Sequence, residues 1–331
     1  MTTTMRRFGA SDLAVAPVGF GTWPIGGARY GTSDDDAAIR ALHAARDAGV
    51  TCFDTAPSYG AGHAEELLGQ AMATGRDKVT IITKGGLIWD DGSHVLGRNS
   101  REDYLVARLD ESLRRLGTDY IDIYAIHWPD AETPLDETMR AMETIVSSGR
   151  ARKIGVCNFT GNQVRAAAGA LHTRRLVANQ VSYHLFDDRW ARSSFPACDD
   201  LGMGAMAYGP LAHGLLSGGI TRETIFDPTD WRASGMIFGQ ALLTPENRVR
   251  NHAVIDRLNG LAQDFGTTLP RLAIAWVLTN PTVTVALCGA RTDAEIIDSA
   301  AAMDLHLSPD ILSAITTVMA DAAGRSDEML T

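Results

Sequence analysis

Short apolar runs alternate with longer segments of helical periodicity along nearly the whole chain, and this alternation sharply narrows the folds available to it. The apolar runs lie at 18–21, 50–55, 79–84, 121–127, 151–159, 176–183, 203–208 and 282–289. The helical segments lie at 34–49, 63–73, 101–116, 136–148, 161–171, 190–200, 248–264, 269–279, 292–303 and 309–321. Strands that are apolar on both faces are typical of parallel sheets covered by helices.

These strand–helix units predict a particular architecture. About eight units over roughly 300 residues fit a (β/α)8 barrel. An open doubly wound sheet is the rival, but its GxGxxG fingerprint is missing, since Gly19 and Gly21 supply only the first part. We predict a single-domain (β/α)8 TIM barrel over residues 1–331, with a short N-terminal hairpin and an extra C-terminal helix. Ser33 is expected to cap the helix at 34–49.

The composition limits the partners of the chain. Its formal net charge of -10 disfavours nucleic acid and anionic membranes, because both require a basic face. The four cysteines form no CxxC pair and no histidine lies at metal-ligand spacing from them, so we expect reduced thiols and no metal site. The N-terminus has no apolar signal segment, and no apolar run approaches the ~18 residues of a membrane span. We predict a cytoplasmic protein that binds small molecules, and its oligomeric state stays open.

Ionisable residues follow three successive predicted strands. The strand at 50–55 ends in Asp54, and Tyr59 comes shortly after it in DTAPSYG. The next strand ends in Lys84, and the one after it in His127. Active sites of barrels lie at the C-terminal ends of the strands, so these side chains are expected to meet at one rim.

Together these side chains can deliver a proton to a carbonyl oxygen. A free phenol has a pKa of ~10, and a contacting ammonium lowers that pKa by about 1–3 units. We expect Lys84 to lower the pKa of Tyr59 in this way. A buried carboxylate needs a partner, and Asp54 is expected to pair with Lys84. A neutral His127 would orient the carbonyl group through a hydrogen bond.

The motifs DTAPSYG, ITKGG, IHWP, IGVCNF, NQVSY and YGPLAHGLLSG resemble those of the aldo-keto reductase superfamily. The resemblance covers essentially the whole chain, from VGFGTW at 18–23 to the helix after GART at 289–292. It implies a barrel that binds a nicotinamide cofactor without a Rossmann fingerprint. It also implies a catalytic tetrad, which is Asp54, Tyr59, Lys84 and His127. Hydride would pass between nicotinamide C4 and a carbonyl carbon, with Tyr59 donating the proton, and alcohol oxidation would use the same site.

The same resemblance implies which residues hold the cofactor. Asn158 and Gln180 match positions that bind the nicotinamide carboxamide, and Cys157 stands where the family often has serine. Tyr208 matches the ring that stacks on the nicotinamide. The positions that match the pyrophosphate loop are Gly209, Pro210, Leu211, Leu215, Ser217 and Gly218. Two further residues, Gly21 and Thr22, match contacts near the nicotinamide ribose.

The segment GARTDAEIIDSA resembles the family's site for the 2′-phosphate of NADPH. The matching residues are Gly289, Ala290, Arg291 and Thr292, and Arg291 is suited to pair with a phosphate. Glu295 stands where many members have arginine or glutamine, and Ser299 where they have asparagine. A glutamate repels a phosphate but accepts a hydrogen bond from a ribose hydroxyl. We predict NADPH as the cofactor, with NADH as the alternative.

Two further features bear on the substrate. An apolar pocket mouth is predicted from four aromatic residues, which are Trp23, Tyr30, Trp89 and Trp128. The segment 219–247 has no clean period, and irregular segments of that length are often lids. We predict a lid over the cofactor that carries Trp231 or Phe238 onto it.

The sequence leaves three functions open. The first is the reduction of an aldehyde or ketone, or the reverse oxidation of an alcohol such as a sugar. The second is a cofactor-binding regulatory subunit with little turnover, which the intact tetrad disfavours. The third is Schiff-base chemistry on Lys84, which requires a lysine of lowered pKa that Asp54 should prevent.

Overall fold

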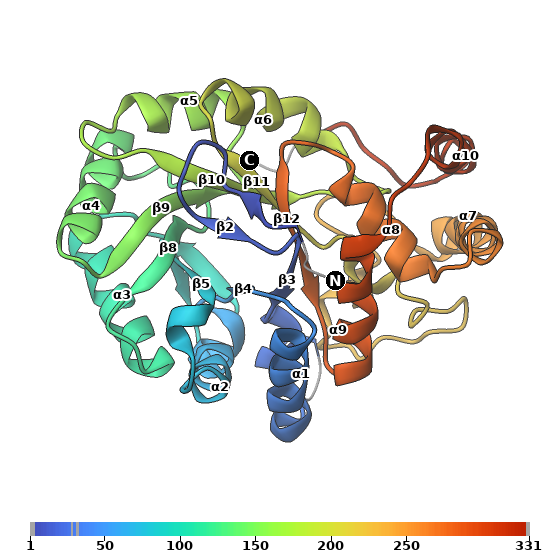
Figure 1. Ribbon diagram of the computed structural model, residues 1–331, viewed down its shortest axis with the longest axis horizontal. Coiled ribbons are helices and arrows are strands. Elements are labelled where there is room, and N and C mark those ends of the chain that lie inside the picture. Colours follow the sequence, from blue (N-terminus) through green and yellow to red (C-terminus); the bar gives the residue numbers. More distant parts are fainter. Residues whose placement is uncertain (1–3, 28, 31–32, 329–331) are drawn as a thin grey trace.

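In the computed structural model, which describes residues 4–27, 29–30 and 33–328, eight parallel strands close into a barrel (Figure 1). The strands are β3 (Val18–Gly21), β4 (Cys52–Asp54), β5 (Thr80–Gly85), β8 (Ile121–Ile126), β9 (Ala151–Cys157), β10 (Leu176–Ser182), β11 (Gly204–Tyr208) and β12 (Val283–Gly289). The barrel closes because β12 pairs with β3. The predicted barrel is therefore confirmed, and the open sheet is excluded.

Helices surround this barrel, as Figure 1 shows. They are α1 (Asp35–Asp47), α2 (His63–Ala71), α3 (Glu102–Leu116), α4 (Leu135–Ser147), α5 (Gly161–Gly169), α6 (Arg189–Asp200), α8 (Leu269–Leu278) and α9 (Asp293–Ala300). Two more helices, α7 (Pro245–Asp264) and α10 (Pro309–Met319), pack against each other to one side of the ring. The 3-10 turns are η1 (Trp23–Gly26), η2 (Tyr59–Gly62), η3 (Arg76–Lys78), η4 (Ala212–Gly214), η5 (Trp231–Ser234) and η6 (Ala301–Asp304).

The start of α1 differs from the prediction by one residue. The side chain of Asp34, and not that of Ser33, accepts the hydrogen bond from the backbone N–H of Ala37. The Ser33 hydroxyl instead donates to the carbonyl of Ile25 at 2.9 Å. Both residue types cap helices well, so this choice depends on a tertiary contact that local pattern does not contain.

Two hairpins add to the barrel. The first, β1 (Arg6–Arg7) with β2 (Ala14–Val15), is the predicted N-terminal hairpin. Its Phe8 and Val15 pack onto the inward-facing strand residues, and the backbone N–H of Ala10 donates to Gly202 ahead of β11. The hairpin therefore closes the end of the barrel opposite the carboxyl ends of the strands.

The second hairpin follows β5 and was not predicted. It consists of β6 (Leu87–Trp89) and β7 (Val95–Arg98), and it stands at the carboxyl rim. The Asp91–Gly92 pair between two apolar stretches is a turn signal that would have indicated it. This hairpin extends the rim and supplies residues to the site described below.

The apolar core has three parts. One lies among α7, α8 and α10 and includes Leu258 and Ile315. A second part fills the barrel interior, where Ile82, Ile123 and Met206 pack together, and the third lies between the strands and the helices. All four cysteines are buried and free. Among the described residues, no helix combines the length and apolar character needed to cross a bilayer. With one barrel end closed and the interior filled, the open rim is where the polar strand ends collect.

Candidate active site

Three neighbouring strands bring the predicted ionisable residues to one rim. Strand β4 ends at Asp54 and pairs with β5, which carries Lys84 at its penultimate position. His127 directly follows β8, and its backbone N–H donates to the carbonyl of Gly85 at 2.9 Å. Tyr59 opens the turn η2 that follows β4. The parallel register thus gathers residues that are far apart in sequence.

Lys84 is the centre of this cluster. Its Nζ atom lies 2.8 Å from both carboxylate oxygens of Asp54 and 2.8 Å from the carbonyl oxygen of Thr55. A fourth, longer contact of 3.3 Å joins Nζ to the Tyr59 hydroxyl. The carboxylate also accepts a 2.7 Å hydrogen bond from Nε2 of Gln180. The predicted ion pair is therefore present. Lys84 is fully buried, and these hydrogen bonds supply the partners that a buried charge needs.

This environment keeps Lys84 charged and His127 neutral. Burial acts to lower the pKa of Lys84, but the attraction of Asp54, with Tyr59 and Cys157, outweighs burial and raises it. Burial, assisted by repulsion from Lys84, holds the pKa of His127 well below its usual range. A neutral imidazole next to a charged ammonium can hydrogen-bond a carbonyl oxygen without competing for its proton.

The expectation for the acidity of Tyr59 is wrong. Burial raises the pKa of Tyr59 to about 12, although Lys84 acts in the opposite direction. Two features explain the result. The phenol is removed from water, and the lysine charge is largely compensated by the carboxylate that holds it at shorter distance. Tyr59 is therefore a firmly protonated donor rather than a phenol close to ionisation.

The Tyr59 ring is fixed from two sides. Trp23 stacks on it with ring centroids 6.0 Å apart, and His127 meets it edge-on at 5.9 Å. Its hydroxyl end therefore points to the space between Lys84 and the cavity, where both Tyr59 and His127 line the wall. The two groups best suited to contact one carbonyl oxygen thus face the same space.

That space is a cavity of about 1120 Å³. Its lining reaches from Arg98 on β7 and Trp128 after β8 to Glu295 and Ser299 on α9. The predicted cofactor residues that line it are Gly21, Asn158, Gln180, Tyr208, Gly209, Pro210, Leu211, Ser217, Gly289, Arg291 and Glu295. Of the other predicted site residues, Thr22, Lys84, Leu215, Gly218 and Thr292 are not among the described residues of the lining.

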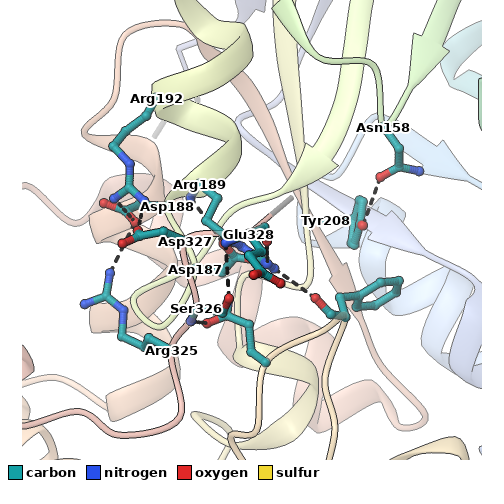
Figure 2. A network of polar contacts seen from close by, with 12 residues as sticks. Asn158, Asp187, Asp188, Arg189, Arg192, Tyr208, Arg325, Ser326, Asp327 and Glu328 are labelled. Carbon is teal, nitrogen blue, oxygen red and sulfur yellow. Dashed lines mark hydrogen bonds and ion pairs between the residues drawn. The ribbon is translucent and has the colours of Figure 1, made fainter. Parts of the chain in front are cut away.

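The amide groups at the middle of the cavity already make hydrogen bonds. Asn158, whose φ is 61°, donates from Nδ2 to the carbonyl of His127 at 3.1 Å. Its Oδ1 accepts from the hydroxyl of Tyr208 at 3.0 Å, as Figure 2 shows. These bonds fix the Tyr208 ring in the cavity wall. The side-chain carbonyl oxygen of Gln180 and the second amide hydrogen of each group stay available to a ligand amide.

His213 is a cavity residue that the sequence did not identify as important. It has a φ of 56° in η4, and its ring lies close to those of Tyr208 and Trp231. Its Nε2 is buried and has no hydrogen-bond partner among the described residues. Burial holds its pKa well below the usual range, so the ring is neutral. An unpartnered polar atom in the wall is suited to a ligand with hydroxyl or amide groups.

The α9 end of the cavity holds a carboxylate at the helix N-terminus. Glu295 accepts a 2.7 Å hydrogen bond from the backbone N–H of Arg291 and completes a capping box with Thr292. The Arg291 guanidinium donates to the carbonyl of Tyr30. The backbone N–H groups of Arg291 and Thr292, just ahead of the helix, are therefore occupied by this protein's own acid.

Three of the four predicted aromatic residues line the cavity mouth, namely Trp23, Tyr30 and Trp128. Trp89 is not among the described lining residues, because its ring lies in the β6–β7 hairpin against Arg108. The same hairpin supplies Leu87, Val95 and Arg98 to the lining, and the prediction missed these. Part of the pocket mouth is thus formed by a hairpin that was not predicted.

Segment 219–247 lies along the cavity and brings aromatic rings to it. Trp231 stacks on Trp23 with ring centroids 5.3 Å apart, and Phe238 lies 5.0 Å from His213. Both Trp231 and Phe238 line the cavity. In the described residues, no group of three or more His, Cys, Asp or Glu side chains is arranged to hold a metal ion.

Comparison with known proteins assigns the family. The model of the aldo/keto reductase family matches residues 17–320, and the chain belongs to this family. An aldo-keto reductase of Bacillus subtilis is 35% identical over 86% of this chain and 84% of its own length. An NADH-specific methylglyoxal reductase of Escherichia coli is 31% identical over 96% of this chain and 98% of its own length.

A solved structure agrees with this assignment. The structure of a glycerol dehydrogenase from Gluconobacter oxydans matches with a TM-score of 0.86 and 32% identity, covering 98% of each chain. The chain is therefore an oxidoreductase of a family that uses nicotinamide nucleotides. The amide and aromatic residues in the middle of the cavity fit such a group.

Proposed function

We propose that this protein reduces a small aldehyde or ketone to an alcohol with a nicotinamide nucleotide, or oxidises the alcohol in reverse. The observation that supports this most is the Tyr59 hydroxyl, which lies 3.3 Å from the charged Lys84 and beside the neutral His127 in the cavity wall. The nucleotide, when bound, supplies or accepts the hydride. This chain's residues must then hold the carbonyl group and move one proton.

Tyr59 is the proton donor in this scheme. Its raised pKa keeps the proton on the phenol throughout the neutral pH range, so the donor stays protonated there. As the carbonyl oxygen gains negative charge, the Tyr59 proton passes to it, and the adjacent Lys84 ammonium stabilises the phenolate that is left. Asp54 acts through Lys84, because it fixes the ammonium and keeps it charged. His127, neutral and across the ring edge from Tyr59, donates to the same oxygen and orients it.

Schiff-base chemistry is not favoured by this arrangement. A lysine nucleophile needs a neutral amine, and the contact with Asp54 raises the pKa of Lys84. The four buried free thiols suit a reducing compartment, and we place the protein in the cytoplasm on that ground.

For the cofactor we favour NADH, although the sequence alone favoured NADPH. The reason is Glu295, whose carboxylate occupies the N-terminus of α9 and lines the cavity next to Arg291. A 2′-phosphate there would meet this acid, whereas a ribose hydroxyl can donate to it. A relative points the same way, since the similar methylglyoxal reductase of Escherichia coli is named as NADH-specific.

Segment 219–247 serves as the lid in this proposal, because it presents Trp231 and Phe238 to the cavity. Nucleotide binding should then protect the segment from limited proteolysis by at least about tenfold, since cleavage requires local opening. Equal cleavage with and without nucleotide contradicts the lid.

The first experiment is reduction of an aromatic aldehyde, followed by nicotinamide absorbance, with NADH and NADPH in parallel. Turnover in the native protein that is lost in Tyr59→Phe supports the proposal. Binding of nucleotide without turnover of a panel of aldehydes, ketones and alcohols overturns it in favour of a regulatory subunit. Trapping of a carbonyl substrate on Lys84 by borohydride, detected by mass, overturns it in favour of Schiff-base chemistry.

A further inference from the structure

A buried arginine connects the cavity lid to the last part of the chain. Arg189, at the start of α6, makes two 2.8 Å bonds to the carboxylate of Asp187, and both side chains are nearly fully buried. The same guanidinium donates to the backbone carbonyl of Phe238 at 2.9 Å and to that of Glu328. Figure 2 shows Arg189, Asp187 and Glu328 in one cluster of polar contacts. One side chain therefore holds the lid and the tail segment, Ala323–Glu328, together.

The lid residue that Arg189 holds has a strained backbone. Ile237 and Gln240 exchange backbone hydrogen bonds of 2.8 and 2.9 Å across a tight turn. The two central residues, Phe238 and Gly239, have φ values of 44° and 80°. Such a turn suits Asn or Gly at its first central position, and a bulky residue there is an outlier that its surroundings must enforce. The turn keeps its shape because other groups hold it.

The tail segment supplies the rest of that support. The backbone N–H of Ser326 donates to the side chain of Gln240 at 3.3 Å, and that of Ala241 donates to Gly324 at 2.9 Å. Asn251 on α7 bonds both to Leu242 and to Ala323. A side chain at Gly324 would clash with the carbonyl of Ala241, so the two segments touch backbone to backbone. The carboxyl end of the turn is thus tied to the tail.

The held turn places the Phe238 ring in the cavity wall. The ring centroid lies 5.6 Å from that of Tyr208 and 5.4 Å from that of Trp231. Tyr208 is itself fixed by its bond to Asn158. No described residue of the tail segment lines the cavity, and the turn is the contact of the tail that reaches the cavity wall.

We propose that Arg189 is a positioning residue of the reaction, because it locks the strained turn to the tail segment and so holds the Phe238 ring beside Tyr208 in the nucleotide site. This rests on the proposed function, since the affected ligand is the nicotinamide nucleotide. The effect should fall on nucleotide affinity and on KM for the nucleotide, while kcat at saturation changes little. Tyr59 and Lys84 are untouched by the lock.

The test is a double-mutant cycle between Arg189→Lys and Phe238→Asn, read as the Kd of NADH from tryptophan fluorescence. Lysine keeps a charge against Asp187 but cannot make the four bonds of the guanidinium fork. Asparagine tolerates the left-handed turn and removes the ring. We expect Arg189→Lys to raise the Kd about tenfold in the native background and less than about twofold when Phe238 is already asparagine.

The matched control is Arg192→Lys, the same change one turn later on α6. Arg192 bonds Asp188 and Asp327, and it does not contact the turn. We expect its Kd for NADH to equal that of the native protein. The proposal is overturned if Arg192→Lys weakens NADH binding as much as Arg189→Lys does. It is also overturned if Arg189→Lys weakens NADH binding equally with phenylalanine and with asparagine at position 238, because either result shows a general structural effect.

A second measurement needs no nucleotide. Hydrogen exchange of the Gln240 amide, which closes the turn, should accelerate by at least about tenfold in Arg189→Lys and stay unchanged in Arg192→Lys. Unchanged exchange in Arg189→Lys contradicts the lock even if the variant binds NADH poorly. The two proposals can fail separately. If the native protein binds no nicotinamide nucleotide but exchange is still faster in Arg189→Lys, the proposed function is refuted and the contact between Arg189 and the turn stands.

Discussion

The two ends of the cavity are built in opposite ways. At one end, Asp54, Lys84 and His127 extend from adjacent strands, and Lys84 is fully buried with short contacts to its partners. At the other end, Arg291 and Glu295 lie at the start of α9, where the side chains are exposed. The first end is held by the barrel, and the second by a short loop and one helix.

Because of this difference, substitutions should affect the catalytic end and the end that selects the cofactor to different extents. Buried charges in a fixed geometry interact strongly, and removing one partner leaves an uncompensated charge. Exposed charges are screened by water and salt, so each contributes little. The chemistry should therefore be hard to alter by substitution, whereas the preference between NADH and NADPH should shift with a single side chain.

The largest effect is expected for Tyr59→Phe. Removing the hydroxyl takes away the proton donor, and turnover should fall by about 10²–10⁴-fold. The Kd for nucleotide should not change, because the ring still stacks on Trp23. Steady-state kinetics and fluorescence titration of the same preparation measure both. Turnover within about threefold of native would eliminate Tyr59 as the donor.

Lys84→Met should cost activity and stability together. The phenolate loses its stabilising charge, and the buried Asp54 carboxylate is left with Gln180 as its remaining side-chain donor. Breaking a buried pair costs about 3–5 kcal/mol, which chemical denaturation measures. Adding Asp54→Asn should recover most of the stability but none of the turnover. If turnover returns with stability, Lys84 has only a structural role.

A smaller effect is expected at the other end. Glu295→Gln removes the negative charge from the N-terminus of α9 and should improve the Kd for NADPH relative to NADH by about 3–10-fold. Fluorescence titration with both nucleotides measures the ratio. Asp293→Asn is the control, because Asp293 lies in the same exposed first turn but is not among the described lining residues. An equal shift in both variants would point to general electrostatics.

The smallest effect concerns pH. Tyr59 must be protonated to donate, and burial raises its pKa to about 12, so activity is lost only as the pH rises through that value. We expect kcat for carbonyl reduction to vary by less than about twofold from about pH 6 to pH 9. A decline centred near pH 8 would mean that Lys84 outweighs burial.

Local pattern predicted the framework well. The strand ends at Asp54, Lys84 and His127 follow from the alternation of apolar and helical segments, and the barrel that they imply is confirmed. Two local details differ from the prediction. Asp34 caps α1 because Ser33 donates to Ile25, and the β6–β7 hairpin was not predicted, although Asp91–Gly92 is a turn signal between two apolar stretches.

The prediction of a lowered pKa for Tyr59 was wrong for a different reason. The prediction from the sequence weighed only the ammonium of Lys84, and an ammonium lowers a phenol pKa. The structure adds burial and places Asp54 closer to Lys84 than Tyr59 is. The burial of Tyr59 and the distances from Lys84 to its two neighbours are properties of the folded chain, and the spacing of residues in the sequence does not give them. Trp89 turned away from the cavity for the same kind of reason, since Arg108 is its neighbour only in space.

The sequence by itself determined which residue types reach the rim, because strand periodicity and the parallel arrangement fix where each strand ends. The tertiary structure alone decided how those groups share charge, which of them lose water and which distant segments touch. The connection from Glu328 through Arg189 to Phe238 spans segments far apart in the chain. Electrostatic and packing energies depend on separation in space, and only the folded chain sets those separations.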